Sequence, residues 1–193
     1  EQSPYINGIT QINGYTEFEQ PQVIENQDMA QLGYSDIRAY EIENAGELAW
    51  FVQHFYAGDL ETQNVSLADN IDMSALAAYS WTPLGYYNVE TQTGKSYDGV
   101  FDGNGYSISN IILNQINGVD LVSKVSEEQA AVLGTQLIEN IAQNALAGVF
   151  GYIGSAGHVT ELKLENTSIT SNADAGVLTG RNEGSISACV TSG

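Results

Sequence analysis

The chain has 193 residues, of which 24 are acidic and only 5 are basic, so its formal net charge is −19 at pH 7. A surface that binds nucleic-acid phosphates or an anionic membrane needs clustered Lys and Arg side chains, and these five are scattered along the sequence. We therefore expect neither nucleic acid nor an anionic membrane as a partner. The length suits a single unit with a sizeable core.

The first 40 residues are rich in Gln, Asn, Glu and Tyr and show weak periodicity. They contain two short strand-like patches, at Tyr5-Ile6 and at Val23-Ile24. We interpret residues 1–40 as a leader or cap and residues 41–193 as the domain that follows. No signal peptide is visible, and we expect that one was removed before Glu1.

Residues 42–56 carry apolar side chains at the spacing of one helix face. Asn44 followed by Glu47 forms a capping-box pattern at the start, and Gly58 suits the end. We expect this helix to cover the open end of the repeats described below, where it would block unwanted strand pairing. A partner-binding helix is the alternative.

Aromatic residues are concentrated between positions 79 and 97. Flat rings beside carboxylates can stack on sugars, and our candidates for a glycan-contact surface are Trp81, Tyr86, Tyr87 and Tyr97. The alternative is that several of these rings pack a core that is otherwise thin.

One pattern occurs three times in the second half of the chain. Gly-Val-[Phe/Leu] stands at 99–101, 148–150 and 176–178, each followed by a Gly-led turn and by Gly-x-[Ile/Val]-x-x-[Ile/Leu/Cys]. Short apolar strands between turn formers, repeated after 176 − 148 = 28 residues, indicate a solenoid of stacked coils. The predicted inward columns are Ile108/Val159/Ile186, Ile111/Leu162/Cys189 and Phe101/Phe150/Leu178.

The segment 176–189 resembles a GLUG-motif repeat. Segments 81–85 and 101–108 resemble the region that precedes such repeats in surface proteins of anaerobic gut bacteria, and 44–51 resembles their opening helix. The resemblance spans residues 40–193 and implies an all-β fold, a right-handed parallel β-helix, in adhesin-like proteins or non-catalytic parts of IgA-protease-like chains. The chain departs from the pattern at Leu178-Thr179, where Leu-Val is usual, and in a long insertion between the first two copies.

That insertion, residues 115–146, has apolar residues at helical spacing: Ala130, Leu133, Leu137, Ile141 and Ala145. We expect a helix that packs on the side of the solenoid. A more specific hypothesis for the same residues is that this helix acts as a lid or a docking element.

The search for catalytic and metal-binding patterns finds little. His54 has no second His four residues later, His158 lies in a repeat turn, and Cys189 falls at a core position. Segment 98–105 is rich in the turn-forming residues Gly, Asp and Asn, but it lacks the ligand spacing of an EF-hand. We therefore predict no catalytic residue, no metal site, no cofactor and no intramolecular disulfide.

Four aspartates keep an enzymatic alternative open. Polysaccharide lyases and glycosidases need converging acids, and stacked strands would bring together Asp69, Asp72, Asp98 and Asp102. The predicted function is nevertheless a bacterial module, secreted or on the cell surface, that binds glycans or host proteins or acts as a stalk. A weaker alternative is an accessory region of a surface protease.

No apolar run in the sequence is long enough to span a bilayer. The chain stops just after a repeat, without a polar cap. We therefore expect it to be a fragment or to be followed by another module.

Overall fold

The computed structural model describes residues 20–57, 60–76, 81–88, 92–114, 146–171 and 174–193. The expectations for the first 19 residues lie outside the described residues. So does the predicted helix of the insertion, of which only Leu146 is described.

The elements up to residue 76 are β1 (Gln22–Glu25), α1 (Gln27–Gln31), β2 (Arg38–Ile42), α2 (Ala45–Ala57), β3 (Asn64–Leu67), β4 (Ile71–Asp72) and the 3-10 helix η1 (Met73–Leu76). Next come β5 (Tyr86–Asn88), β6 (Thr93–Lys95), β7 (Val100–Asp102), β8 (Ser107–Ser109) and β9 (Ile112–Asn114). The last part contains β10 (Phe150–Ile153), β11 (His158–Thr160), β12 (Lys163–Glu165), β13 (Ser168–Thr170), β14 (Thr179–Asn182), β15 (Ser185–Ser187) and β16 (Val190–Ser192).

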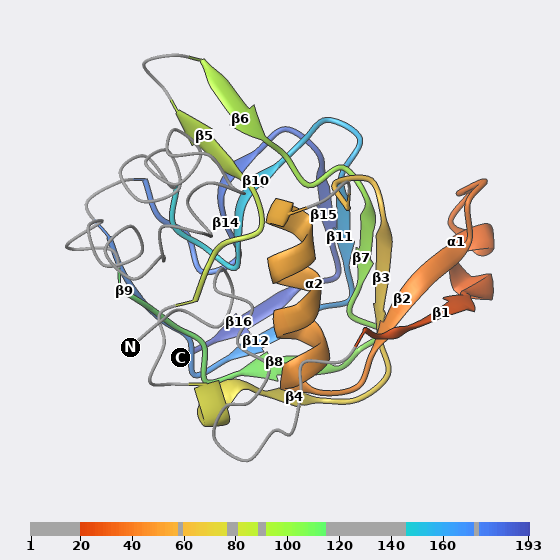
Figure 1. Cartoon of the computed structure of the whole chain (residues 1–193), viewed down its shortest axis with the longest axis horizontal. Coiled ribbons are helices and arrows are strands. Elements are labelled where there is room, and N and C mark those ends of the chain that lie inside the picture. The colour runs from red at the N-terminus through yellow and green to blue at the C-terminus, as the bar shows by residue number, and fades with distance from the viewer. Residues whose placement is uncertain (1–19, 58–59, 77–80, 89–91, 115–145, 172–173) are drawn as a thin grey trace.

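The described strands form five sheets. A six-stranded sheet has the order β1-β2-β3-β7-β11-β15, and a four-stranded sheet has the order β16-β12-β8-β4. Three strand pairs complete the set: β10 with β14, β13 with β9, and β5 with β6. The two larger sheets lie on different sides of α2 (Figure 1).

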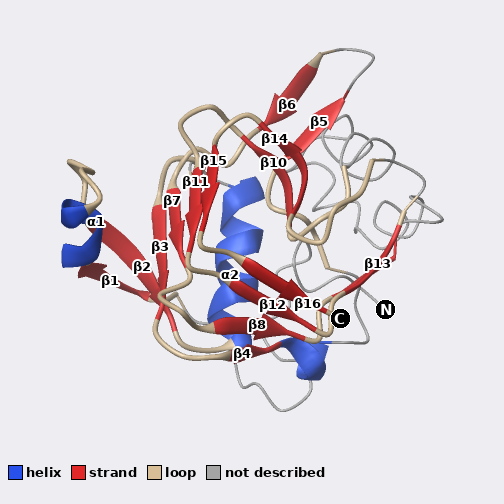
Figure 2. Ribbon diagram, turned by 180° about the vertical axis from the view of Figure 1, so that it is seen from behind, coloured by secondary structure: helices blue, strands red, loops and turns tan. Residues whose placement is uncertain are grey.

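The predicted all-β, right-handed parallel β-helix is wrong. The described residues form a mixed arrangement of several sheets, in which β1–β2 and β5–β6 are antiparallel and the other pairs are parallel. Helix α2 lies among the sheets in both views (Figures 1 and 2). The repeat pattern specifies short strands and tight turns, which many β architectures share, and it does not specify how sheets assemble.

The predicted alignment of the first repeat copy is also wrong. Phe101 pairs with Val159, which in turn pairs with Ile186 as predicted. Phe150 instead lies opposite Thr179 in another sheet, and its ring contacts Phe101 edge-on at 5.2 Å. Segment 99–101 is thus the structural equivalent of 157–159, because a Gly two residues before a buried apolar residue occurs both at 148–150 and at 157–159.

The same correction applies to the next strand. Ile108 pairs with Leu164 and Ile71 rather than with Val159. Leu162 and Leu164 are buried while Lys163 between them is exposed, as the alternating pattern predicts.

The predicted helix at 42–56 is present as α2, which begins at Ala45 because Ile42 is the last residue of β2, and it forms part of the core. Asn44 accepts a hydrogen bond from the Glu47 backbone N–H at 3.0 Å, and Glu47 accepts one from the Glu43 N–H at 2.7 Å. This local capping explains where the helix starts. The fully buried side chains on its apolar stripe are Leu48, Ala49, Phe51, Val52 and Phe55.

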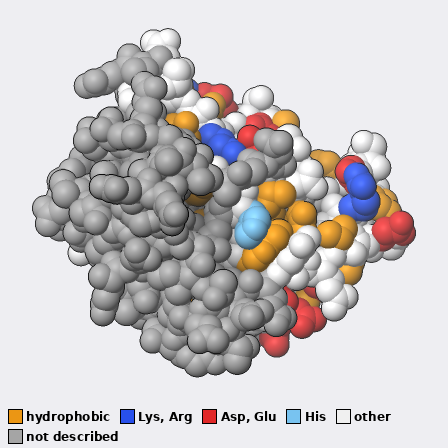
Figure 3. Space-filling view, viewed as in Figure 1, with side chains coloured by type: hydrophobic (Ala, Val, Ile, Leu, Met, Phe, Trp, Pro, Cys, Tyr) orange, Lys and Arg blue, Asp and Glu red, His pale blue; other side chains and the backbone are white. Residues whose placement is uncertain are grey.

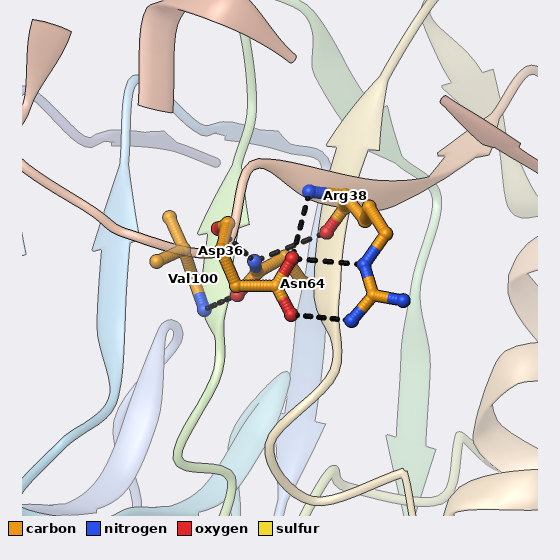
Figure 4. A network of polar contacts seen from close by, with 4 residues as sticks. All are labelled: Asp36, Arg38, Asn64 and Val100. Carbon is orange, nitrogen blue, oxygen red and sulfur yellow. Dashed lines mark hydrogen bonds and ion pairs between the residues drawn. The ribbon is translucent and has the colours of Figure 1, made fainter. Parts of the chain in front are cut away.

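Asn64 connects three strands of the six-stranded sheet (Figure 4). Its buried side-chain amide donates to the carbonyl oxygens of Asp36 at 2.9 Å and Arg38 at 3.1 Å. Its side-chain oxygen accepts from the Val100 N–H at 2.9 Å. The side chain therefore links the start of β2 and the start of β7 to β3.

Replacing Asn64 should destabilise the fold. Asn64→Ala leaves the Val100 N–H and two carbonyl oxygens without these partners, and a lost buried partner costs about 1–3 kcal/mol. Urea denaturation should show a lower free energy of unfolding by that amount. The matched control is Gln31→Ala, an exposed amide whose loss should change stability by less than about 0.5 kcal/mol. Equal effects of both variants would contradict the role given to Asn64.

Candidate binding site

Two of the four predicted ligand-contact residues are core residues. Trp81 is 2% exposed, and its indole N–H donates to the Val149 carbonyl at 3.0 Å. Tyr97 is fully buried, and its hydroxyl lies 2.9 Å from the Gln63 carbonyl and 3.1 Å from the Val100 carbonyl. Buried Tyr and Trp rings need such partners for their polar atoms, so both positions suit packing, which was the alternative reading.

The other two predicted residues lie on the β5–β6 hairpin. Tyr86 pairs with Lys95 and Tyr87 pairs with Gly94. Both rings are partly buried, and burial raises the pKa of the Tyr86 hydroxyl. A side chain at Gly94 would collide with the Tyr86 carbonyl, so Gly94 permits the close pairing that holds Tyr87 in place.

Tyr87 belongs to a surface cluster that brings together distant parts of the chain. The Arg181 guanidinium carbon lies 3.8 Å from the centre of the Tyr87 ring and 5.2 Å from that of Tyr152. The two rings meet edge-on with their centres 5.5 Å apart. Glu183 accepts hydrogen bonds from Arg181 Nε at 3.0 Å and from the Tyr152 hydroxyl at 2.8 Å. We call these four residues the aromatic cluster.

The charges within the aromatic cluster are mutually stabilised. Hydrogen bonds from Arg181 and then from Tyr152 lower the pKa of the Glu183 carboxyl. Burial, and then the hydrogen bond to Glu183, raise the pKa of the Tyr152 hydroxyl. At neutral pH the cluster therefore holds a guanidinium and a carboxylate beside two partly exposed Tyr rings in one arrangement. Their side chains are still accessible: 34% of Arg181 and 40% of Glu183 is exposed.

A surface depression of about 450 Å³ begins on the same hairpin. Its lining residues are Glu61, Thr62, Gly94, Lys95, Ser96 and Asp98. Lys95 Nζ lies 3.2 Å from a Glu61 carboxylate oxygen and 5.0 Å from the centre of the Phe55 ring. In Figure 3 the basic side chains visible on this face likewise lie beside acidic ones. The depression thus offers both hydrogen-bond donors and acceptors next to Tyr87, the pairing partner of Gly94.

The four aspartates of the enzymatic alternative lie on β4, on β7 and in the two loops that precede these strands. Asp102 is buried on β7 and accepts from Asn26 Nδ2 at 3.1 Å, whereas Asp72 is on β4 in the other large sheet. Asn110 and then Ser74 lower the pKa of Asp72 through hydrogen bonds. Asp98 accepts from the Ala156 N–H at 3.2 Å, and Asp69 from the Asn70 N–H at 2.7 Å. Each carboxylate is thus engaged by its own neighbours.

A chain of hydrogen bonds around His158 was not foreseen from the sequence. The Tyr34 hydroxyl contacts His158 Nδ1, and His158 Nε2 lies 2.9 Å from Ser187 Oγ. Ser187 in turn donates to Thr160 Oγ1 at 3.0 Å. Ser187 reaches His158 because strand pairing places β15 beside β11. Tyr34 is 124 residues away in sequence, and no local pattern marks it as a partner.

The described residues contain no group of three or more His, Cys, Asp or Glu side chains placed to hold a metal ion. Among the same residues, no helix combines the length and the apolar character that a membrane crossing needs.

Comparisons with known proteins give one relevant similarity. No family model matches the chain, and no solved structure matches it. The chain is 28% identical over 156 residues to halomucin of Haloquadratum walsbyi (strain DSM 16790 / HBSQ001). This match covers 80% of the chain but only 1% of halomucin. The similarity points to an extracellular or cell-surface location.

Protonation of His158 should make stability depend on pH. Burial lowers the pKa of His158 below 6.5, although the nearby Asp102 carboxylate opposes this shift. Because the unfolded state then binds a proton more readily than the folded state, folding stability is lost as the pH falls below the unfolded value. Thermal unfolding between about pH 7.5 and about pH 5 should show a larger loss for the native chain than for His158→Gln, which cannot be protonated. Parallel curves would exclude this contribution.

Proposed function

We propose that this chain is a non-catalytic, adhesin-like module, secreted or displayed on the cell surface, which binds neutral glycans at the aromatic cluster. The observation that carries the proposal is the partly exposed grouping of two Tyr rings, a guanidinium and a carboxylate at one place. The similarity to halomucin, whose name denotes a mucin, supports a role outside the cell. The resemblance of segment 176–189 to GLUG-motif repeats supports the adhesin-like character.

The chemistry of the aromatic cluster suits a sugar. A pyranose has an apolar C–H face that can pack on the exposed part of a Tyr ring. Its hydroxyl groups can form hydrogen bonds with a guanidinium and with a carboxylate at the same time. Arg181 and Glu183 are held by each other and by Tyr152 before any ligand arrives. Pre-organised side chains lose little entropy on binding.

The charge of the chain favours a neutral glycan over an acidic one. Each side-chain cation near the hairpin has an acidic neighbour: Arg181 has Glu183, and Lys95 has Glu61. With a net charge of −19, the chain repels a uronate or sialate on approach. No free positive patch on the described part of this region compensates for that repulsion.

A glycan array with neutral and acidic sugars, read with calcium and again with chelator, tests the proposal. We expect neutral glycans to bind. Tyr87→Ala should weaken binding by at least about tenfold, or about 1.4 kcal/mol, whereas Tyr87→Phe should retain it because the ring remains. The matched control is Tyr106→Ala, a partly buried Tyr outside the cluster, which should leave binding unchanged.

Other outcomes would decide against this function. If the Tyr87→Ala variant still bound glycans, the binding site would lie outside the aromatic cluster. Shortened or unsaturated sugar products would show an enzyme and would make Asp69, Asp72, Asp98 and Asp102 the first residues to replace. Absence of any glycan binding would leave a stalk or a protein-binding module.

A further inference from the structure

The pattern Asn-x-Ser/Thr occurs twice in the sequence, at Asn64-Val65-Ser66 and at Asn166-Thr167-Ser168. When x is not Pro, this pattern is the acceptor signal for N-linked glycosylation, and it is used where the Asn lies on the surface of an exported protein. A pattern this short also arises by chance. The surroundings of each Asn side chain therefore decide whether it can be modified.

The first of the two, Asn64, has no room for a sugar in the folded chain. It is 8% exposed, and its amide nitrogen already donates to the carbonyl oxygens of Asp36 and Arg38. Ser66, which supplies the hydroxyl of this pattern, is 4% exposed and accepts a hydrogen bond from Asn26 at 3.1 Å. A sugar on the Asn64 nitrogen would displace these contacts between strands. Asn64 thus has a structural role and is not an acceptor.

The second, Asn166, lies in the turn that joins β12 to β13. Its φ is 50°, a left-handed conformation that Asn tolerates better than most residues. The residue is exposed, and its side-chain amide makes no hydrogen bond with the described residues. Strand β12 lies between β8 and β16, and the Asn166 backbone N–H donates to the Ser192 carbonyl at 3.1 Å. Because strands flank this turn on both sides, the exposure of Asn166 comes from its place at an outward corner and not from a sheet edge.

The hydroxyl that completes the second pattern is accessible at the same corner. Ser168 is the first residue of β13 and is exposed, and its hydroxyl makes no hydrogen bond with the described residues. Thr167 between them turns inward, with its side-chain oxygen buried. The amide and the hydroxyl that a transferase recognises therefore both lie on the solvent side of the turn.

We propose that Asn166 is the attachment site of an N-linked glycan, which a cellular oligosaccharyltransferase transfers from a lipid phosphate or pyrophosphate donor. The Asn166 amide nitrogen forms a bond to the anomeric carbon of the glycan, and the bond between that carbon and the phosphate oxygen of the donor breaks. The lipid phosphate leaves with the electron pair, and the amide loses one proton to solvent. The modification requires the extracellular or cell-surface location to which the halomucin similarity points, but it does not require glycan binding.

A glycan on Asn166 would leave the aromatic cluster open. The turn between β12 and β13 lies beside the end of β16 and away from the β5–β6 hairpin (Figure 2). Tyr87 lies on that hairpin, and the other members of the cluster lie on β10, on β14 and directly after β14. Modification of Asn166 and binding at the aromatic cluster are therefore measurable separately.

Peptide mapping of the protein isolated from the surface or the medium of the cells that make it tests this proposal. Cleavage after Lys and Arg places the two patterns in separate peptides, residues 39–95 and residues 164–181. Mass spectrometry should find the added mass of a glycan on peptide 164–181 and none on peptide 39–95. Electron-transfer fragmentation should place the glycan on Asn166. Asn110 is an internal control that should stay unmodified, because it has a φ of 60° at the equivalent position after β8 but is followed by Ile112 instead of Ser or Thr.

Variants made in the same cells identify the modified atom. Asn166→Asp keeps the size of the side chain and its tolerance of a left-handed turn but lacks the amide nitrogen, so the glycan should be lost completely. Ser168→Ala should also abolish the modification, whereas Ser168→Thr, which keeps a hydroxyl, should retain it. A glycan on the Ser168 oxygen would instead survive Asn166→Asp.

Two results would overturn the proposal: a peptide 164–181 without a glycan, or a glycan that persists in Asn166→Asp. Binding of Asn166→Asp on the glycan array should equal that of the native chain. If the chain binds glycans while Asn166 is unmodified, only this inference fails. If Asn166 carries a glycan and the chain binds no sugar, only the proposed binding function fails.

Discussion

The ring of Tyr97 is the interaction on which the rest of the structure depends. It contacts Phe51 and Phe55 of α2 with ring centres 6.4 Å apart, Phe101 of β7 at 6.3 Å and Phe150 of β10 at 5.7 Å. These are tilted or edge-on contacts, the geometries that aromatic pairs favour. One fully buried side chain thus joins the helix to two different sheets.

The backbone of Tyr97 also connects the core to β10, the strand that carries Tyr152 of the aromatic cluster. Its N–H donates to the Tyr152 carbonyl at 2.9 Å, and its carbonyl accepts from the Gly154 N–H at 3.0 Å. These bonds hold β10 next to the segment that leaves the β5–β6 hairpin. Because Tyr87 lies on that hairpin and Tyr152 lies on β10, the geometry of the aromatic cluster depends on the packing of the core beneath it.

Acidic side chains dominate the charge of the protein, whereas aromatic side chains hold its core together. The acidic side chains oppose close approach of two copies over most of the surface, and salt weakens that opposition. The last four strands, β13 to β16, differ from this pattern, since they consist almost entirely of Ser, Thr, Ile and Val with Gly and Asn, and Arg181 is their one charged residue.

The sequence by itself determined the local features of this protein. The spacing of Leu48, Phe51 and Phe55 and the Asn44–Glu47 pattern located α2, because helix periodicity and capping act within a few residues. Alternation predicted that Lys163 would be exposed between two buried Leu residues. The pairing of Val159 with Ile186 followed from two closely spaced repeat copies.

Only the tertiary structure decided the register of the first repeat copy, the assembly of the sheets and the composition of the candidate site. Tyr97 and Trp81 are residue types that often contact ligands, yet neighbours from distant segments of the chain bury them. Tyr87 and Arg181 meet only because the β5–β6 hairpin lies against β10, the partner of β14. Periodicity reports which face of an element is apolar, but it carries no information about which distant element covers that face.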